Sequence, residues 1–393
     1  MIIDSLDGGP RSDAPSIRHV RGALLRAPGP GDHDGTTLAS GVFTQTGKRV
    51  TEAETVTFAG RLSLDCPPPD PGKARRRTGH WLFGGLVFNH FGHAFIYSLA
   101  RLWAIERLRT QGVALDGILY FQRGPRDPGL PPHFGPRMGA ALKVFNPDLP
   151  LDTVCDQERV EHLYVPDQGI STTPDLFAGI PDHHAFMRRH GRAGATDAPE
   201  VDLYISRTKT GPTKGNHILE DVIERHMAAA GYQIYHPQAD GLADQIATYQ
   251  RARRIVGVDG SAFHVAATAV GPTARIAILS RRAFFAEAMA RQVRAFSGAE
   301  VHTIRAYCEV YSHERGLGKD SQWYRTLVLT DFDLLGQRLV DLGFLDRAPD
   351  WKAPKRDRLE ARLGRWGTRL GTTFLRVPDE MLVSEPGAEF DRS

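Results

Sequence analysis

Apolar and polar positions alternate most regularly between residues 201 and 279. Val201, Leu203 and Ile205 are separated by single residues, which is the period of a strand. The next segment, ILEDVIERHMAAAG, carries an apolar helical stripe and ends naturally at Gly231. The strands YQIYHP, IVGV and RIAILS then alternate with the helices GLADQIATYQRARR and SAFHVAATAVG. Strands and helices that alternate at this spacing predict an α/β fold with a parallel sheet and helical crossovers.

The remaining segments are less regular. The first 80 residues are rich in Gly, Pro, Asp and Arg with short strand-like runs, and CPPPDPGKARRRTG from Cys66 is typical of an exposed loop. A helix is expected from about His90 to Arg109, followed by the strand GILYFQ. The polar stretch 183–199 predicts an interdomain linker. We therefore expect an irregular segment at 1–80, domains at 81–198 and 199–300, and a helix-rich extension at 301–393.

Composition and charge narrow the class of protein. The chain of 393 residues is long enough for two domains, and 41% hydrophobic residues are typical of a globular protein. Lys and Arg number 49 against 46 Asp and Glu, a balance that argues against nucleic acid as a partner. The three cysteines lie far apart without a CxxC pair, which argues against a zinc cluster and a disulfide framework. No secretory signal and no transmembrane run is visible, so we expect a cytoplasmic protein.

Three predicted strand ends bring polar residues to the carboxyl edge of the sheet, where ligands of such folds bind. The loop SRTKTGPTKGN after the strand VDLYI carries Arg207, Lys209 and Lys214. His236 follows the strand YQIY, and Gly260 and Ser261 follow the strand IVGV. Gly260 allows a ligand close to the backbone, and the helix that begins at Ser261 offers N–H donors and the positive end of its dipole. With the basic side chains, these groups predict a metal-free clamp for a phosphate or diphosphate.

Plainer interpretations of the same residues stay open. Ser261 can be a simple helix N-cap, and the two lysines can be solvated loop charges. No GxGxxG follows a predicted strand, which argues against a Rossmann dinucleotide site. The pair Ser261 and His264 lacks the GxSxG elbow of a serine hydrolase. Asp331 and Asp333 form a DxD pair of the kind that holds a divalent ion, but they precede a periodic helix, so an N-cap at Asp331 is preferred.

The stretch GGLVFNHFGHAFIYSLARLW, residues 84–103, combines an apolar helix with titratable side chains. A helical wheel separates a buried stripe (Phe91, Phe95, Leu99 and Leu102) from a second edge (His90, His93, Tyr97 and Arg101). A histidine beside a cleft can accept a proton from a hydroxyl group. The alternative is that both histidines cap the helix and bond a neighbouring loop. Metal binding by the two histidines is disfavoured because no carboxylate or cysteine stands at ligand spacing nearby.

Taken together, these segments resemble glycosyltransferase family 61. The resemblance covers roughly residues 80–300 and rests on residues 84–103, LYISRTK, LEDVIERHMAAAGYQIYHP, ADQIATYQRARRIVG and DGSAFH, in that order. It implies a GT-B-like fold, in which two Rossmann-like domains face each other across a cleft. In that arrangement the domain at 81–198 lies on the acceptor side, and the domain at 199–300 binds the nucleotide sugar.

The resemblance also implies an activity. Members are inverting transferases that move a hexose or pentose from a nucleotide-activated donor to a saccharide or glycolipid acceptor, without an obligatory metal or other cofactor. For a cytoplasmic bacterial enzyme, the implied product is a surface polysaccharide such as a capsule. A catalytically inactive nucleotide- or carbohydrate-binding protein of the same fold is the alternative. The basic segment near residue 75 can contact the inner membrane surface or can be a solvated loop, and the sequence leaves both alternatives open. It predicts no oligomeric state.

The family motifs, carried onto this chain, give Arg207, Glu220, Gln245, Gly260, Ser261, His93 and Asn89, and the other site residues come from the strand ends and the helix edge described above. The donor group then comprises Arg207, Lys209, Lys214, Glu220, Gln245, Asp259, Gly260 and Ser261, with His264 near it. On the acceptor side, His93 is the matched histidine and the expected base, with His90, Asn89, Tyr97 and Arg101 around it. The chain departs from many relatives at two positions: Tyr97 replaces an acidic residue, and Asp259 replaces a histidine. The identity of the general base therefore stays open.

Overall fold

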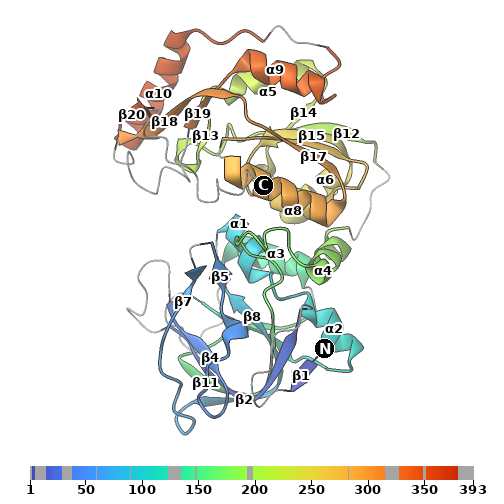
Figure 1. The fold of residues 1–393 in the computed structure, drawn as a ribbon, viewed down its shortest axis with the longest axis vertical. Helices are drawn as coiled ribbons and strands as arrows, with labels where there is room; N and C mark the ends of the chain where they lie inside the picture. The colour runs from blue at the N-terminus through green and yellow to red at the C-terminus, as the bar shows by residue number, and fades with distance from the viewer. Residues whose placement is uncertain are drawn as a thin grey trace. The chain divides into compact units, whose positions relative to one another are not determined.

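The computed structural model divides the chain into two compact units, residues 1–193 and 194–393, and each is described by itself (Figure 1). The residues described are 2–4, 15–28, 38–58, 60–88, 90–122, 134–146, 148–192, 198–281, 283–314, 327–347 and 351–378. The division falls within the polar stretch 183–199, although helix α4 (Pro181–Gly191) occupies its first part. In this part of the chain, no helix combines the length and the apolar character that crossing a bilayer requires.

The first unit is built on a mixed sheet. Its elements are β1 (Ile2–Asp4), β2 (Ile17–Arg26), β3 (Leu38–Ala39), β4 (Gly41–Phe43), η1 (Thr51–Ala53), β5 (Val56–Thr57), β6 (Gly60–Arg61), β7 (Ser63–Leu64), β8 (Arg75–Leu86), α1 (Phe91–His93), η2 (Ala94–Ser98), α2 (Ala104–Thr110), β9 (Gly117–Phe121), α3 (Gly135–Phe145), β10 (Leu151–Thr153), β11 (Gln157–Pro166) and α4. The strand order is β1-β2-β11-β8-β9-β10, with β4 paired to β2. Strands β8, β9 and β10 run parallel and are joined by helices, whereas β2 is antiparallel to β11. The first 80 residues thus supply strands to this sheet.

Strand β8 begins earlier than the sequence pattern indicates. The basic run at 75–77, expected in an exposed loop, already pairs with β11. Arg77 explains why, because its guanidinium bonds Glu158 at 2.6 Å and Asp152 at 2.8 Å and lies 4.5 Å from the ring centre of Trp81. The single positive charge of Arg77 is therefore paired with carboxylates of β10 and β11.

The expected helix from His90 to Arg109 is interrupted. Its first part is α-helical only at Phe91–His93, η2 is a π-helix, and a turn at 99–103 precedes the α-helix α2. The amide of Leu99 bonds the carbonyl of Ala94 at 3.0 Å, which is the i to i−5 bond of a π-turn. Of the predicted buried stripe, Phe95, Leu99 and Leu102 are buried, whereas Phe91 is only partly buried. The wider π-turn changes the faces on which the residues after Ser98 lie.

The second unit contains a parallel sheet and a smaller mixed sheet. Its elements are β12 (Val201–Ile205), η3 (Pro212–Lys214), β13 (Asn216–His217), α5 (Glu220–Ala229), β14 (Gln233–Tyr235), η4 (Pro237–Ala239), α6 (Leu242–Gln250), β15 (Ala252–Val258), α7 (Ala262–Ala269), β16 (Arg275–Leu279), α8 (Ala283–Ser297), β17 (Glu300–Ile304), β18 (Tyr307–His313), β19 (Leu327–Thr330), α9 (Phe332–Asp341), α10 (Arg356–Leu370) and β20 (Phe374–Arg376).

The parallel sheet confirms the predicted strand–helix alternation. Its order is β14-β12-β15-β16-β17, and every pair is parallel. Helices α6 and α8 cover one face, and α5 and α9 cover the other (Figure 1). Because both faces are covered, Leu203, Tyr204 and Ile205 are all buried, and not only the alternate residues.

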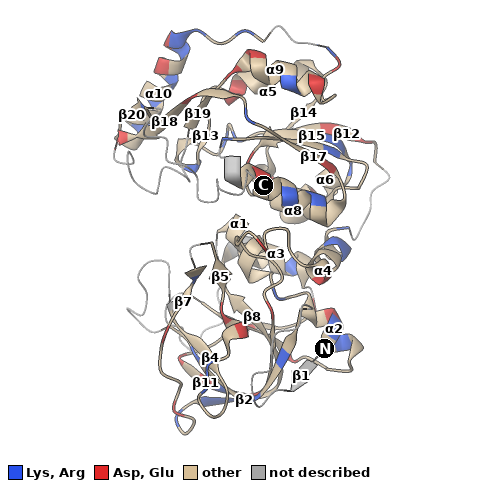
Figure 2. Ribbon diagram, viewed as in Figure 1, with Lys and Arg blue, Asp and Glu red and all other residues tan. Residues whose placement is uncertain are grey.

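The region after residue 300 differs from the expected helix-rich extension. Strand β17 completes the parallel sheet, and β13-β19-β18-β20 form a second sheet beside α9 and α10. Apolar residues of α9 pack on those of α5 in one core, so this region belongs to the second unit. The predicted N-cap is confirmed, since the Asp331 carboxylate accepts a bond from the Leu334 amide at 3.0 Å. Basic and acidic residues are interspersed along α10 (Figure 2).

Candidate functional site

The parallel sheet of the second unit has a topological switch point beside β12. From β12 the chain moves outward to β14, and then returns to β15 on the other side of β12. In sheets of this order, ligands bind at the carboxyl ends of the two strands between which the direction changes. Ser206 and Arg207 follow β12, and residues 259–261 follow β15. The two candidate segments therefore meet at the edge where a ligand is expected.

Arg207 and Gly260 are in direct contact at this edge. A Cβ atom built on Gly260 would lie 2.4 Å from Nη1 of Arg207, so any side chain there would displace the guanidinium. Nη2 of Arg207 donates to the carbonyl oxygens of Lys214 at 3.0 Å and Gly215 at 3.2 Å. Its backbone amide donates to Oε1 of Glu220 at 2.8 Å. Arg207 is thus held at three points and lies against the turn that opens α7.

The start of α7 adds a second feature suited to an anion. Ser261 stands at the N-cap position with φ −60° and ψ −12°, and its side chain makes no capping bond in the described structure. The amides of Phe263 and His264 bond back to the carbonyls of Gly260 at 3.1 Å and Ser261 at 3.2 Å. Because the earlier amides of a helix have no intrahelical partner, the helix start presents donors and the positive end of its dipole beside Arg207.

Glu220 supports this arrangement from the core. Its side chain is buried, and Oε1 accepts bonds from the Arg207 amide and from the Tyr204 hydroxyl at 3.2 Å. Burial raises the pKa of Glu220 to about 7, although the amide and the charge of Arg207 oppose the shift. Glu220 therefore orders the junction between β12 and the basic loop, and direct contact with a donor stays a prediction.

The other predicted donor residues have different environments. Lys209 and Lys214 are exposed on the loop after β12. Gln245 is buried, and its Nε2 donates to the carbonyls of Pro237 at 2.8 Å and Asp240 at 3.1 Å, so it holds the loop after β14. Through these contacts, Gln245 fixes the loop that lies at the carboxyl end of β14.

Asp259 and His264 are bound within the protein. The Asp259 carboxylate is fully buried and lies 2.7 Å from Nε of Arg281. Nδ1 of His264 lies 2.6 Å from Oε1 of Gln292. The Asp259 pair holds the turn after β15 in place, and the His264 contact joins α7 to α8. The sequence pattern did not identify Arg281, because this residue follows the end of the strand RIAILS. No neighbouring residue in the sequence indicates that its partner is Asp259.

One further polar residue near this edge, Glu224, was not predicted, whereas His236 was expected here because it follows the strand YQIY. Glu224, one helical turn after Glu220, accepts bonds from the hydroxyls of Ser206 and, at 2.8 Å, Thr208. Nε2 of His236, directly after β14, lies 3.7 Å from the same Glu224 oxygen. The four-residue spacing from Glu220 is the signal that places Glu224 on the same helix face.

The histidine edge of the first unit is present in part. His90 and His93 are exposed, and their ring centres lie 4.6 Å apart. The ring of Tyr97 is 5.6 Å from that of His93, and its hydroxyl lies 2.7 Å from Oγ1 of Thr172. These three side chains lie along one edge, as predicted from their spacing. Asn89 lies outside the described residues.

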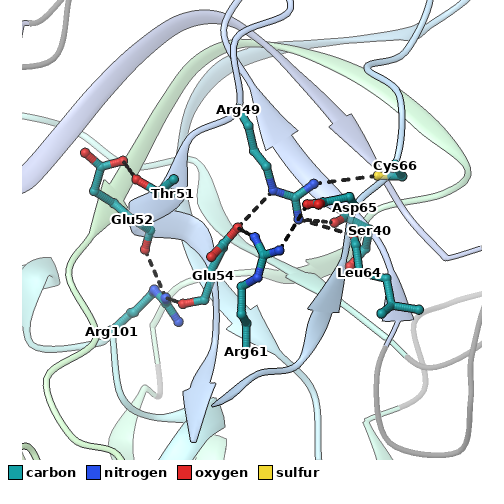
Figure 3. A network of polar contacts seen from close by, with 10 residues as sticks. All are labelled: Ser40, Arg49, Thr51, Glu52, Glu54, Arg61, Leu64, Asp65, Cys66 and Arg101. Atoms are coloured by element: carbon teal, nitrogen blue, oxygen red, sulfur yellow. Dashed lines mark hydrogen bonds and ion pairs between the residues drawn. The ribbon is translucent and has the colours of Figure 1, made fainter.

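Arg101 does not lie on this edge. It is fully buried, and Nη2 donates to the carbonyls of Glu52 at 3.0 Å and Glu54 at 2.7 Å (Figure 3). Nε donates to the carbonyl of Pro166 at 3.1 Å. Burial lowers the pKa of Arg101 to about 10. The π-turn and the following turn direct this side chain into the protein, where it joins the segment around residue 53 to the end of β11.

Residues 91–274 match the family model described as Glycosyltransferase 61. The match supports a glycosyltransferase of that family. It includes His93, Arg207, Glu220 and Gly260, and it leaves out the first 90 residues. A search of curated proteins gives no match.

Two solved structures are similar over most of the chain. One is the bacterial iron-containing dodecameric glycosyltransferase TibC from enterotoxigenic E. coli, with 10% identity, a TM-score of 0.31, and coverage of 90% of this chain and 96% of that chain. The other is the dodecameric iron-containing heptosyltransferase TibC in complex with ADP-D-β-D-heptose, with 10% identity, a TM-score of 0.30 and the same coverage. At this level of similarity, neither structure adds to the assignment.

Within the residues described for this chain, no group of three or more His, Cys, Asp or Glu has the arrangement of a metal site.

Proposed function

We propose that the protein is an inverting glycosyltransferase that moves a sugar from a nucleotide-activated donor to a saccharide or glycolipid acceptor in surface polysaccharide synthesis. The family match over residues 91–274 supports the transferase class. The contact between Arg207 and Gly260 at the switch point of the second unit is the observation that carries the donor chemistry. A reaction without an obligatory metal, a GT-B arrangement and a cytoplasmic location are part of the proposal.

In this proposal the donor diphosphate binds at the carboxyl edge of the second unit. Arg207 and the start of α7 lie together there, and Lys209 and Lys214 add positive charge from the loop. Because two carbonyl groups and Glu220 already hold Arg207, its guanidinium needs little reorganisation when an anion binds. The same groups stabilise the negative charge that grows on the diphosphate as it leaves.

Transfer then requires a base for the acceptor hydroxyl. The exposed imidazole of His93 is the proposed base, and His90 is the nearest alternative. As the base takes the hydroxyl proton, the acceptor oxygen bonds to the anomeric carbon. The bond from that carbon to the diphosphate oxygen breaks with both electrons, so the configuration inverts.

A thermal-shift screen against nucleotide sugars and free nucleotides, with and without EDTA, tests the donor chemistry. A ligand that binds only the folded protein raises its melting temperature. The proposal expects a selective shift with one nucleotide sugar, unaffected by EDTA, and transfer of its sugar to a saccharide. Absence of any shift would contradict the donor site, and a shift that needs a divalent ion would contradict metal independence. Donor binding without hydrolysis or transfer would favour the inactive binding protein.

A further inference from the structure

The β5–β6 hairpin of the first unit presents apolar side chains to solvent. Among the large apolar residues that are exposed in the described part of the chain, Phe58 has the highest exposed fraction, 42%. Val56, two residues before it, is 38% exposed. An aromatic side chain with this exposed fraction on a short hairpin offers apolar surface that a ligand can contact. Both residues precede the segment that matches the family model.

The hairpin is firmly attached to the segment around residue 170. The Val56 amide donates to Oε1 of Gln168 at 2.9 Å, and the Ser171 hydroxyl donates to the Val56 carbonyl at 2.6 Å. The Phe58 amide donates to Oγ1 of Thr172 at 3.1 Å. The backbone that carries Phe58 is therefore held in place.

Thr172 connects this hairpin to the histidine edge. Its Oγ1 accepts the Phe58 amide and lies 2.7 Å from the Tyr97 hydroxyl. The Tyr97 ring is 5.6 Å from the ring centre of His93. Two hydrogen bonds and one ring contact thus separate the Phe58 backbone from the proposed base. The hairpin backbone and the proposed base therefore belong to one connected group of residues in the first unit.

The surroundings of Phe58 suit a saccharide better than a lipid chain. Arg61, on the partner strand of the hairpin, is 46% exposed at its side chain and bonds both Glu54 and Asp65 (Figure 3). The Asp65 side chain is 77% exposed. The charged groups of Arg61 and Asp65 would lose hydration if an acyl chain packed against the hairpin. A pyranose offers C–H groups to an aromatic face and hydroxyl groups to charged neighbours.

We propose that Phe58, with Val56 beside it, is a stacking platform for a sugar ring of the acceptor. This inference rests on the proposed function, because it assigns the ring to the saccharide that His93 activates. Phe58 determines acceptor affinity and takes no part in donor binding.

The test uses the full-length protein with Phe58→Ala, Phe58→Trp and, as a matched control, Leu64→Ala. Leu64 is 40% exposed on nearby β7 and has a similar apolar area. The probes are immobilised neutral and uronate-containing di- to hexasaccharides, and nucleotide-sugar thermal shifts are measured for every variant. Phe58→Ala is expected to weaken glycan binding by about tenfold, the effect of truncating one important contact residue. Phe58→Trp and Leu64→Ala should bind as the wild type does.

Three results would overturn the platform: a wild type that binds none of the glycans, equal binding by Phe58→Ala, or an equal loss with Leu64→Ala. A fourth result would also overturn it: Phe58→Ala binds phosphatidylglycerol vesicles less well than the wild type but binds glycans equally well. That result would assign the hairpin to membrane binding. Failure of the wild type to bind any nucleotide sugar would contradict the proposed function and leave the glycan result to decide the platform separately.

Discussion

Nη1 of Arg207 occupies the space that a side chain at residue 260 would need, since a Cβ atom on Gly260 would lie 2.4 Å from it. The basic loop after β12 and the turn after β15 can therefore meet only while residue 260 is glycine. This contact joins the two strand ends that border the switch point.

Replacing Gly260 with alanine should displace the Arg207 guanidinium. We expect affinity for nucleoside diphosphates, measured by titration calorimetry, to fall at least about tenfold, because a charged hydrogen-bond donor moves away from the anion. Gly364→Ala is the matched control, since a Cβ atom at Gly364 in α10 meets no atom within 4 Å among the described residues. Unchanged affinity in Gly260→Ala would mean that the anion does not bind at this turn.

Arg207→Lys keeps the positive charge but removes the planar fork. Lysine cannot bond the carbonyls of residues 214 and 215 while it also lies against Gly260. Affinity for nucleoside diphosphates should fall by about tenfold to a hundredfold, the range for a lost charged hydrogen bond. The control is Arg253→Lys, because Arg253 pairs with Asp202 at an exposed position. If both variants bind alike, the fork of Arg207 has no role in binding.

Glu220→Gln should change how stability depends on pH. The pKa of Glu220 is raised from 4.5 to about 7 in the folded protein, so its carboxyl destabilises the fold progressively as pH rises from about 4.5 to above 7. At 1.36 kcal/mol per pH unit, the wild type loses about 3 kcal/mol from this group, and the glutamine variant avoids the loss. Denaturant unfolding at pH 5 and pH 8.5 should show the stability of the variant relative to the wild type increasing with pH.

The control for this pH experiment is Glu360→Gln, whose side chain is 66% exposed. Its stability relative to the wild type should hardly vary with pH. If the stability of Glu220→Gln relative to the wild type also hardly varies with pH, Glu220 is already ionised in the folded protein at pH 5.

Much of the second unit could be predicted from the sequence because its signals are local. Each strand and helix between residues 201 and 279 has its own period, and Arg207 and Gly260 immediately follow two of the strands. The pairing of Asp259 with Arg281 could not be predicted in this way, because it depends on which strands are neighbours. The strands after residue 300 were missed for the same reason: β19 pairs with β13, more than 100 residues earlier.

The first unit shows a different limit. The apolar spacing of residues 91–102 is compatible with both an α-helix and a π-turn, so the sequence could not distinguish them. The difference decides the role of Arg101, which lies inside the protein and bonds carbonyl groups from two distant segments. The histidine edge was predictable because His90 and His93 precede the π-helix, and Tyr97 lies within it before the turn at 99–103.

Arg101→Met should therefore impair folding and not donor binding. Three backbone carbonyls would lose a buried charged donor, and the expected loss is about 3–5 kcal/mol in the free energy of unfolding, as for other broken buried networks. Calorimetry should show a large decrease in the melting temperature of the first unit. Arg101 donates to no residue of the second unit among its observed bonds within the described chain, so nucleoside diphosphate affinity of the folded fraction should be unchanged. Loss of that affinity with normal stability would instead return Arg101 to the substrate site.

His93→Ala tests the proposed base directly. If His93 removes the acceptor proton, the variant should lose transfer by at least about a hundredfold, the usual contribution of a positioned general base. Donor affinity should remain within a few-fold, because the residues proposed to bind the diphosphate lie in the other unit. His302→Ala is the control, since His302 is a partly exposed histidine that pairs with Glu300 in the second unit. Transfer that survives in His93→Ala but disappears in His90→Ala would move the base one helical turn toward the start of α1, and survival in both would remove the base from this edge.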